Sequence, residues 1–119
     1  MRSVETTRGV QTTREFAPAD RYLYDFKYCT YAKGWAQIDT KQDASYFGTW
    51  TNPTQRKIFS YCEGDTTLTE CSTDDEYREE LAKVVTWNKE NGYWLGIDPG
   101  FNPEIKDRFV QLGLAELLH

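Results

Sequence analysis

The chain has little of what most enzyme sites use. Its 119 residues include one histidine, His119 at the last position, and three cysteines, at positions 29, 62 and 71. A histidine at the end of the chain is poorly placed to act as a positioned base. Each cysteine falls in an expected strand rather than at a helix N-terminus, where a thiolate would be stabilised. We therefore expect no catalytic residue based on histidine or cysteine, and no enzymatic activity.

Motifs that bind cofactors or metals are also missing. Gly92, Gly96 and Gly100 are spaced by four with large apolar residues between them, which is not a phosphate-binding loop. The sequence has neither the cysteine pairs of a zinc site nor a Glu-His metal signature. No apolar run is long enough to cross a bilayer, and residues 1–14 lack the hydrophobic core of a signal peptide. With an odd number of cysteines, these absences favour a reduced cytoplasmic protein with no cofactor.

Aromatic residues, by contrast, make up 15% of the chain, and five of them fall in residues 43–71. This segment holds three strand-like runs separated by strong turn signals at residues 52–55 and 63–65, so it predicts an antiparallel meander. Turns of this length pair Gly48 with Phe59 and Tyr61 with Leu68, and directly opposed residues share a face. One face then carries Tyr46, Gly48, Trp50, Phe59, Tyr61 and Leu68, and the other Phe47, Thr49, Thr51, Ile58, Ser60, Cys62, Thr67, Thr69 and Cys71. We expect the aromatic face to be buried and the hydroxyl-bearing face to be exposed.

Two further strands are expected upstream of the meander. Residues 22–28 alternate with aromatics at every second position, which is the period of a strand. Residues 35–40 lead into the meander, and two loop lengths are open. A four-residue loop would put Asp39 on the aromatic face, which is costly for an unpaired carboxylate. We prefer a three-residue loop, which places Ile38 beside Tyr46 and Ala36 beside Gly48.

After residue 71 the pattern becomes helical. Thr73 followed by Glu76 predicts a capping box, and Asn102 before Pro103 predicts the start of a second helix. The chain is thus expected to be α+β, an antiparallel β-meander of three to five strands packed on two C-terminal helices that cover the aromatic face. We expect residues 1–15 to form a disordered basic tail and residues 16–119 a single α+β domain.

Charge is distributed unevenly. Residues 1–14 contain three arginines and one glutamate, a charge of +2, which leaves −7 on the remaining residues because the total is −5. Between residues 63 and 80 eight acidic residues accompany one base, Arg78. An acidic surface repels phosphate and attracts basic protein surfaces, although helix N-termini favour acids in any case. We therefore expect a basic protein or nucleoprotein partner, no direct binding of nucleic acid and no membrane contact.

The candidate contact residues lie on the acidic helix and in the aromatic loop of residues 91–103, which joins the two expected helices. Trp87 falls off the apolar stripe of its helix, and Tyr93 and Phe101 are the loop residues best suited to exposure. The full set of expected partner-binding residues is Asp74, Asp75, Glu76, Glu79, Glu80, Trp87, Tyr93 and Phe101.

A metal site is the alternative use of the strand-end carboxylates. Asp39, Asp43, Glu63 and Asp65 fall at strand ends or turns, where such groups can bind Mg²⁺. Turn chemistry accounts for Asp43 and Asp65 equally well, and we expect no metal.

The phrases QDASYFGTW, YCEGD and WLGIDPG, with the helix after the last, resemble small uncharacterised proteins found on plasmids and phages. The resemblance covers residues 35–119 and carries no assigned activity or site residues. It implies a mobile-element origin, and therefore a role against host defence or in plasmid or phage upkeep. The leading hypothesis is a small acidic, non-enzymatic interaction protein, for example an inhibitor of a host defence complex. The alternatives are a nucleic-acid binder using the basic tail and aromatics, and a metal-dependent hydrolase.

Overall fold

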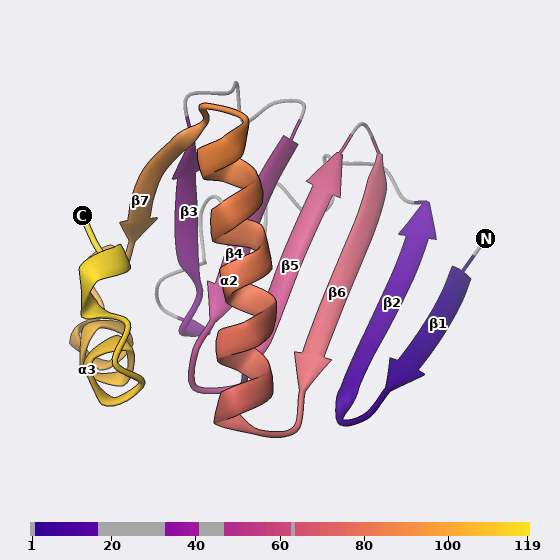
Figure 1. The fold of residues 1–119 in the computed structure, drawn as a ribbon, viewed down its shortest axis with the longest axis horizontal. Helices are drawn as coiled ribbons and strands as arrows, with labels where there is room; N and C mark the ends of the chain where they lie inside the picture. The colour runs from indigo at the N-terminus through magenta and orange to yellow at the C-terminus, as the bar shows by residue number, and fades with distance from the viewer. Residues whose placement is uncertain (1, 17–32, 41–46, 63) are drawn as a thin grey trace.

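A seven-stranded antiparallel sheet dominates the computed structural model, which describes residues 2–16, 33–40, 47–62 and 64–119. Its elements are β1 (Arg2–Thr7), β2 (Val10–Phe16), β3 (Ala36–Thr40), β4 (Phe47–Asn52), β5 (Lys57–Cys62), β6 (Asp65–Cys71), α2 (Asp74–Glu90), β7 (Trp94–Asp98), α3 (Pro103–Gln111) and the short 3₁₀ helix η2 (Ala115–Leu117). The strand order is β1-β2-β6-β5-β4-β3-β7, so β3 to β6 form the expected meander (Figure 1). The helices α2 and α3 follow most of the strands, and the expected α+β class is confirmed.

The helix starts also agree with the sequence analysis. Thr73 and Glu76 form a capping box in which each side chain accepts from the backbone N–H of the other residue. The side chain of Asn102 caps α3 by accepting from the backbone N–H of Glu104 at 3.0 Å, with Pro103 in the first turn. Gly92, just beyond α2, has a φ of 74°, the left-handed conformation that ends a helix.

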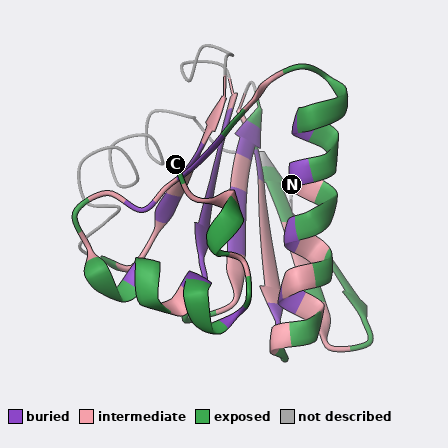
Figure 2. Ribbon diagram, turned by 60° about the vertical axis from the view of Figure 1, so that its left-hand side comes forward, coloured by how far each residue is buried: buried purple, intermediate pink, exposed green. Residues whose placement is uncertain are grey.

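Both faces of the central sheet are buried. Trp50, Phe59 and Tyr61 form a buried cluster with the partly buried Trp35 and Leu68, as expected. The larger core lies on the opposite face, where sheet residues such as Ile58 and Cys71 pack against buried residues of α2 and α3. In Figure 2 the buried residues of α2 face the sheet and the exposed residues line its outer side.

The expectation that the helices cover the aromatic face is therefore wrong. They cover the face expected to be exposed, and Thr49 and Thr51 are buried there. Threonine is compatible with this position because its hydroxyl can be satisfied internally. Thr51 Oγ1 donates to the carbonyl of Lys57 at 3.1 Å and also contacts the hydroxyl of Tyr77 on α2.

The strand register differs from the expected one by two residues in both hairpins. Trp50 pairs with Phe59, and Phe59 pairs with Leu68. A two-residue shift exchanges partners but leaves every side chain on its face, so the aromatic set stays together. The turn after β4 is short because Asn52 Oδ1 accepts from Gln55 N at 3.0 Å and Arg56 adopts a φ of 57°.

The preferred arrangement of β3 is wrong. Ala36 pairs with Thr51 and Ile38 with Thr49, so both apolar residues lie on the helix-covered face. Their burial there explains the arrangement: both belong to the larger core. Asp39 consequently lies on the face of Trp50, the placement that the sequence analysis had rejected.

The expectation that residues 1–15 form a disordered tail is also wrong, because residues 2–16 include β1 and β2. β2 pairs with β6 from Val10↔Cys71 to Phe16↔Asp65, and β1 pairs with β2 to form the edge of the sheet (Figure 1). Threonine favours strands, and this segment is rich in it. At the opposite edge, β7 occupies part of the expected loop and pairs with β3. The strand expected over residues 22–28 and the loop after β3 lie outside the described residues.

Candidate functional site

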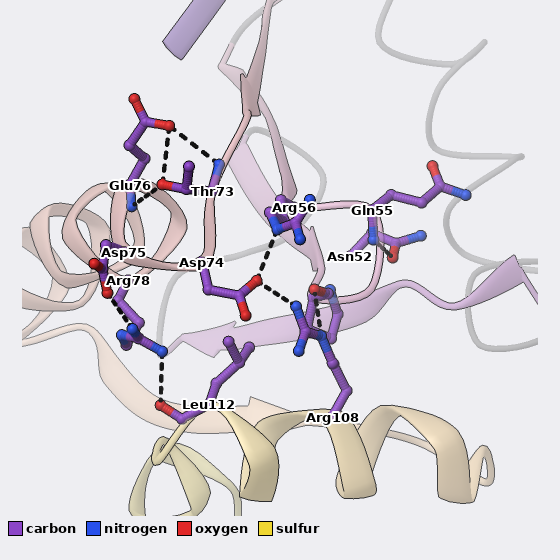
Figure 3. Close-up of polar contacts among 11 residues, drawn as sticks. Asn52, Gln55, Arg56, Thr73, Asp74, Asp75, Glu76, Arg78, Arg108 and Leu112 are labelled. Carbon is purple, nitrogen blue, oxygen red and sulfur yellow. Dashed lines mark hydrogen bonds and ion pairs between the residues drawn. The ribbon is translucent and has the colours of Figure 1, made fainter. Parts of the chain in front are cut away.

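Asp74, the first residue of α2, binds two arginines from distant parts of the chain. Arg56 in the β4–β5 turn donates through Nε to Oδ1 at 2.7 Å, and Arg108 of α3 donates through Nη2 to the same oxygen at 2.5 Å (Figure 3). Arg108 Nε also donates to the carbonyl of Pro53 at 3.1 Å. The hydrogen bonds from Arg56 and Arg108 favour the ionised carboxyl and hold the pKa of Asp74 below its usual range. Asp74 thus joins α2 to the turn and to α3.

Asp75 and Glu76 make comparable intrachain contacts. Asp75 pairs with Arg78, whose Nη1 lies 3.4 Å from the carbonyl oxygen of Leu112 (Figure 3). Glu76 completes the capping box and also accepts from the backbone N–H of Gly9, in the β1–β2 turn, at 2.7 Å. These carboxylates connect α2 to the segment after α3 and to the N-terminal hairpin. Their contacts therefore stabilise the fold.

Glu79 and Glu80 lie further along α2. Glu79 is exposed, and Glu80 Oε2 lies 3.0 Å from Lys83 Nζ. A groove of about 380 Å³ runs between this stretch and the N-terminal hairpin, and Arg8 and Lys83 line it together with the glutamates. The helix surface is consequently mixed in charge, because the fold brings bases to acids that look uncompensated in the sequence.

Two of the expected aromatic contact residues meet a third ring that the sequence analysis did not select. The ring centroids of Trp87 and Tyr93 are 5.7 Å apart, and Phe47 of β4 lies 5.8 Å from Trp87 and 6.3 Å from Tyr93. The rings are tilted by 50–56° to one another. Trp87 remains 47% exposed. We call Phe47, Trp87 and Tyr93 the aromatic cluster.

Phe101 does not share this surface. It lies between β7 and α3, outside the aromatic cluster, and is 76% exposed. Its exposure agrees with the sequence analysis. Exposure of a single apolar side chain is ordinary, and it does not define a site.

A pocket of about 420 Å³ opens beside the aromatic cluster, between the C-terminal half of α2 and the sheet. Its floor includes small hydroxyl-bearing residues, Thr49, Ser60 and Thr67, and its helix wall includes Val84, Trp87 and Asn88. Towards the other end of α2, Tyr77 and Leu81 fill the space against Ile58 and Cys71. The pocket exists because short side chains face each other across the interface where larger ones would have filled it.

Asn88 is the most constrained polar residue of this wall. It is 1% exposed, and its Nδ2 donates to the carbonyl of Val84 at 2.9 Å. That bond fixes the amide orientation, because the flipped amide would oppose two oxygens. Within the described part of the chain, Oδ1 accepts no hydrogen bond. A buried acceptor without a donor is costly, and a donor that reached Oδ1 would relieve this cost.

Two cysteines differ sharply in surroundings. Cys62 is exposed and lines the pocket, whereas Cys71 is buried in the core near α2. Burial, with smaller contributions from Glu80 and Glu76, raises the pKa of the Cys71 thiol to about 11. Cys71 is therefore protonated and unreactive at neutral pH.

The carboxylates considered for a metal do not converge. Asp39 lies on β3 and Asp65 on β6, three strand spacings of about 4.8 Å apart and on opposite faces of the sheet. Asp39 Oδ2 instead lies 2.5 Å from Nε2 of His119, whose backbone N–H donates to Ile97 at 3.1 Å. Asp43 and Glu63 lie outside the described residues. Among those described, no group of three histidine, cysteine or acidic residues is arranged to hold a metal ion.

Comparison with known proteins provides no relative to guide the assignment: no family model, no curated sequence and no solved structure matches the chain. Neither α2 nor α3, nor any other helix in the described ranges, combines the length and apolar character needed to span a membrane. The functional interpretation therefore depends chiefly on the site geometry.

Proposed function

We propose that this chain is a small non-enzymatic interaction protein that binds a basic macromolecular partner through the aromatic cluster and the adjoining pocket. The observation that carries the proposal is the group of three rings in mutual contact, with Trp87 47% exposed beside a pocket of about 420 Å³. Large aromatic residues next to a concavity are typical anchors of protein interfaces.

The acidic residues have divided roles in this proposal. Asp74, Asp75 and Glu76 hold the fold together, so they are not free to be the main contact. Glu79 is exposed, whereas the side chain of Glu80 is partly buried and paired with Lys83; the net charge of −5 favours approach by a basic partner. Peripheral charges of this kind act mainly on the association rate.

The resemblance to plasmid and phage proteins gives this binding function a biological setting, inhibition of a host defence complex or maintenance of the element. The nucleic-acid alternative has less support. Its basic segment is folded into β1 and β2, where Arg14 lies 3.9 Å from Glu5. The hydrolase alternative also has less support, because Asp39 and Asp65 lie on opposite faces of the sheet and cannot bind one metal ion together.

Affinity capture from a cell lysate tests the proposal. Proteins retained by the wild-type chain should be lost with Trp87→Ala and kept with Phe101→Ala. The second variant is the control, because it also removes an exposed aromatic ring but one outside the aromatic cluster. With a captured partner in hand, Trp87→Ala should raise Kd at least tenfold, mainly through faster dissociation. Retention by Trp87→Ala together with loss by Glu79→Lys would contradict the proposal and place the contact on the acidic stretch.

A further inference from the structure

The polar groups that line the pocket beside the aromatic cluster restrict the kind of ligand that can bind there. Oδ1 of Asn88 is a buried acceptor that needs a donor. The carboxylate-bearing residue Asp65 lines the same pocket and is exposed to solvent. Both groups call for hydrogen-bond donors, and Asp65 adds a preference for positive charge.

The aromatic rings beside the pocket also favour a positively charged ligand. Phe47 and Trp87 line the pocket, and Tyr93 packs against both rings from outside it. Ring faces attract cations, and tryptophan does so most strongly. Among the described residues of the lining, Lys83 is the single base, and its Nζ lies 3.0 Å from Glu80 Oε2, so its charge is compensated.

We propose that this pocket binds the guanidinium group of an arginine side chain presented by the basic partner. The inference rests on the proposed function and specifies its central contact. Guanidinium is planar, stacks on aromatic rings and is more weakly hydrated than ammonium. It also carries five N–H donors, enough to serve Asn88 Oδ1 and Asp65 together while the hydroxyls of Thr49, Ser60 and Thr67 accept others.

Lysine fits less well, because its compact ammonium keeps a strong hydration shell and cannot stack as a plane. A neutral apolar side chain would fill the space but leave the Asn88 acceptor unpaired. The site therefore distinguishes its ligands by charge and by planarity.

Calorimetric titration with blocked five-residue peptides, each with one test residue flanked by glycines, measures this selectivity. The arginine peptide should bind at least tenfold more tightly than an otherwise identical citrulline peptide, which keeps the shape but loses the charge. The lysine peptide should fall between them, and a norleucine peptide should bind no better than citrulline. Equal affinity for arginine and citrulline, or for arginine and norleucine, would overturn the inference.

Variants locate the binding. Asn88→Leu and Asp65→Asn should each weaken the arginine peptide about tenfold. Asp107→Asn, on the exposed side of α3, removes the same charge as Asp65→Asn and should leave affinity unchanged. Asp65 is exposed, so its variant tests the site even if Asn88→Leu folds poorly. Equal effects of Asp65→Asn and Asp107→Asn would mean that only net charge matters and would overturn the inference.

The two proposals fail separately. If no arginine peptide binds but Trp87→Ala still loses the partner captured from lysate, the surface is a docking site and its assignment to arginine is wrong. If the arginine peptide binds with the expected selectivity but no captured partner depends on Trp87, the pocket chemistry stands and the docking function does not.

Discussion

The two halves of α2 meet the same sheet in different ways. In the N-terminal half, Tyr77 and Leu81 are fully buried, and Asp74 and Glu76 of the first turn are bonded to other parts of the chain. In the C-terminal half, Asn88 faces small hydroxyl-bearing residues across a pocket, and Trp87 is half exposed. The N-terminal half is packed for stability. The C-terminal half leaves a pocket and a hydrogen-bond acceptor without a donor, both of which a ligand can use.

The largest expected effect comes from the packed half. Leu81→Ala should lower the free energy of unfolding by about 2–5 kcal/mol, because it removes a fully buried side chain and leaves a cavity. Val84→Ala, at the pocket wall, should cost only about 1 kcal/mol because the space beside it is already open. Urea denaturation measures both. Equal losses would contradict the difference between the halves.

A smaller effect is expected at the cap of α2. Glu76→Ala should cost about 1–2 kcal/mol, since the carboxylate accepts from the backbone N–H groups of both Thr73 and Gly9. Glu79→Ala removes a carboxylate from an exposed position of the same helix and should stay within about 0.5 kcal/mol of wild type. Thermal unfolding at neutral pH compares the two. A cost at Glu79 matching that at Glu76 would show that helix charge, rather than the specific contacts, stabilises this half.

Acid titration of stability isolates Asp74. Its pKa is lower in the folded state than the ordinary value of 3.8, so its contribution is present at neutral pH and is lost as pH falls below about 4. Wild type should therefore lose stability over this range more steeply than Asp74→Asn, and the two curves should converge at the acid end. Measurement of Tm against pH shows this, and parallel curves would contradict the role of Arg56 and Arg108.

Only a small stability effect is expected at Asn88, although the pocket proposal predicts an about tenfold loss of affinity for its variant. Asn88→Leu gives up the hydrogen bond to Val84 but removes a buried acceptor that lacks a donor, so unfolding free energy should change by less than about 1 kcal/mol. Chemical denaturation checks this. A loss of several kcal/mol would mean that Asn88 is chiefly structural.

Much of the local structure could be read from the sequence. The capping box at Thr73 and Glu76 and the cap at Asn102 depend on residues three or fewer positions apart, and such signals survive in any tertiary context. The grouping of Trp50, Phe59 and Tyr61 was also predictable, because strand alternation fixes the face even when the register shifts by two.

The site depends on long-range contacts that no local pattern contains. Phe47 was assigned to an exposed face, and the helix that covers this face begins at residue 74. Asn88 is buried on the inner side of α2, and its unpaired oxygen follows from the short residues opposite it, which lie on strands of the sheet. Asp74 looked available because its two partners, Arg56 and Arg108, are distant in the chain.

The most direct test of the pocket assignment is a two-dimensional ¹H–¹⁵N NMR titration of the labelled chain with the single-arginine peptide. The assignment predicts that the side-chain amide of Asn88 and the indole N–H of Trp87 shift progressively, while amides around Tyr77 and Leu81 stay in place. Shifts confined to the N-terminal half of α2 or to the β1–β2 hairpin, with Asn88 and Trp87 unmoved, would contradict it.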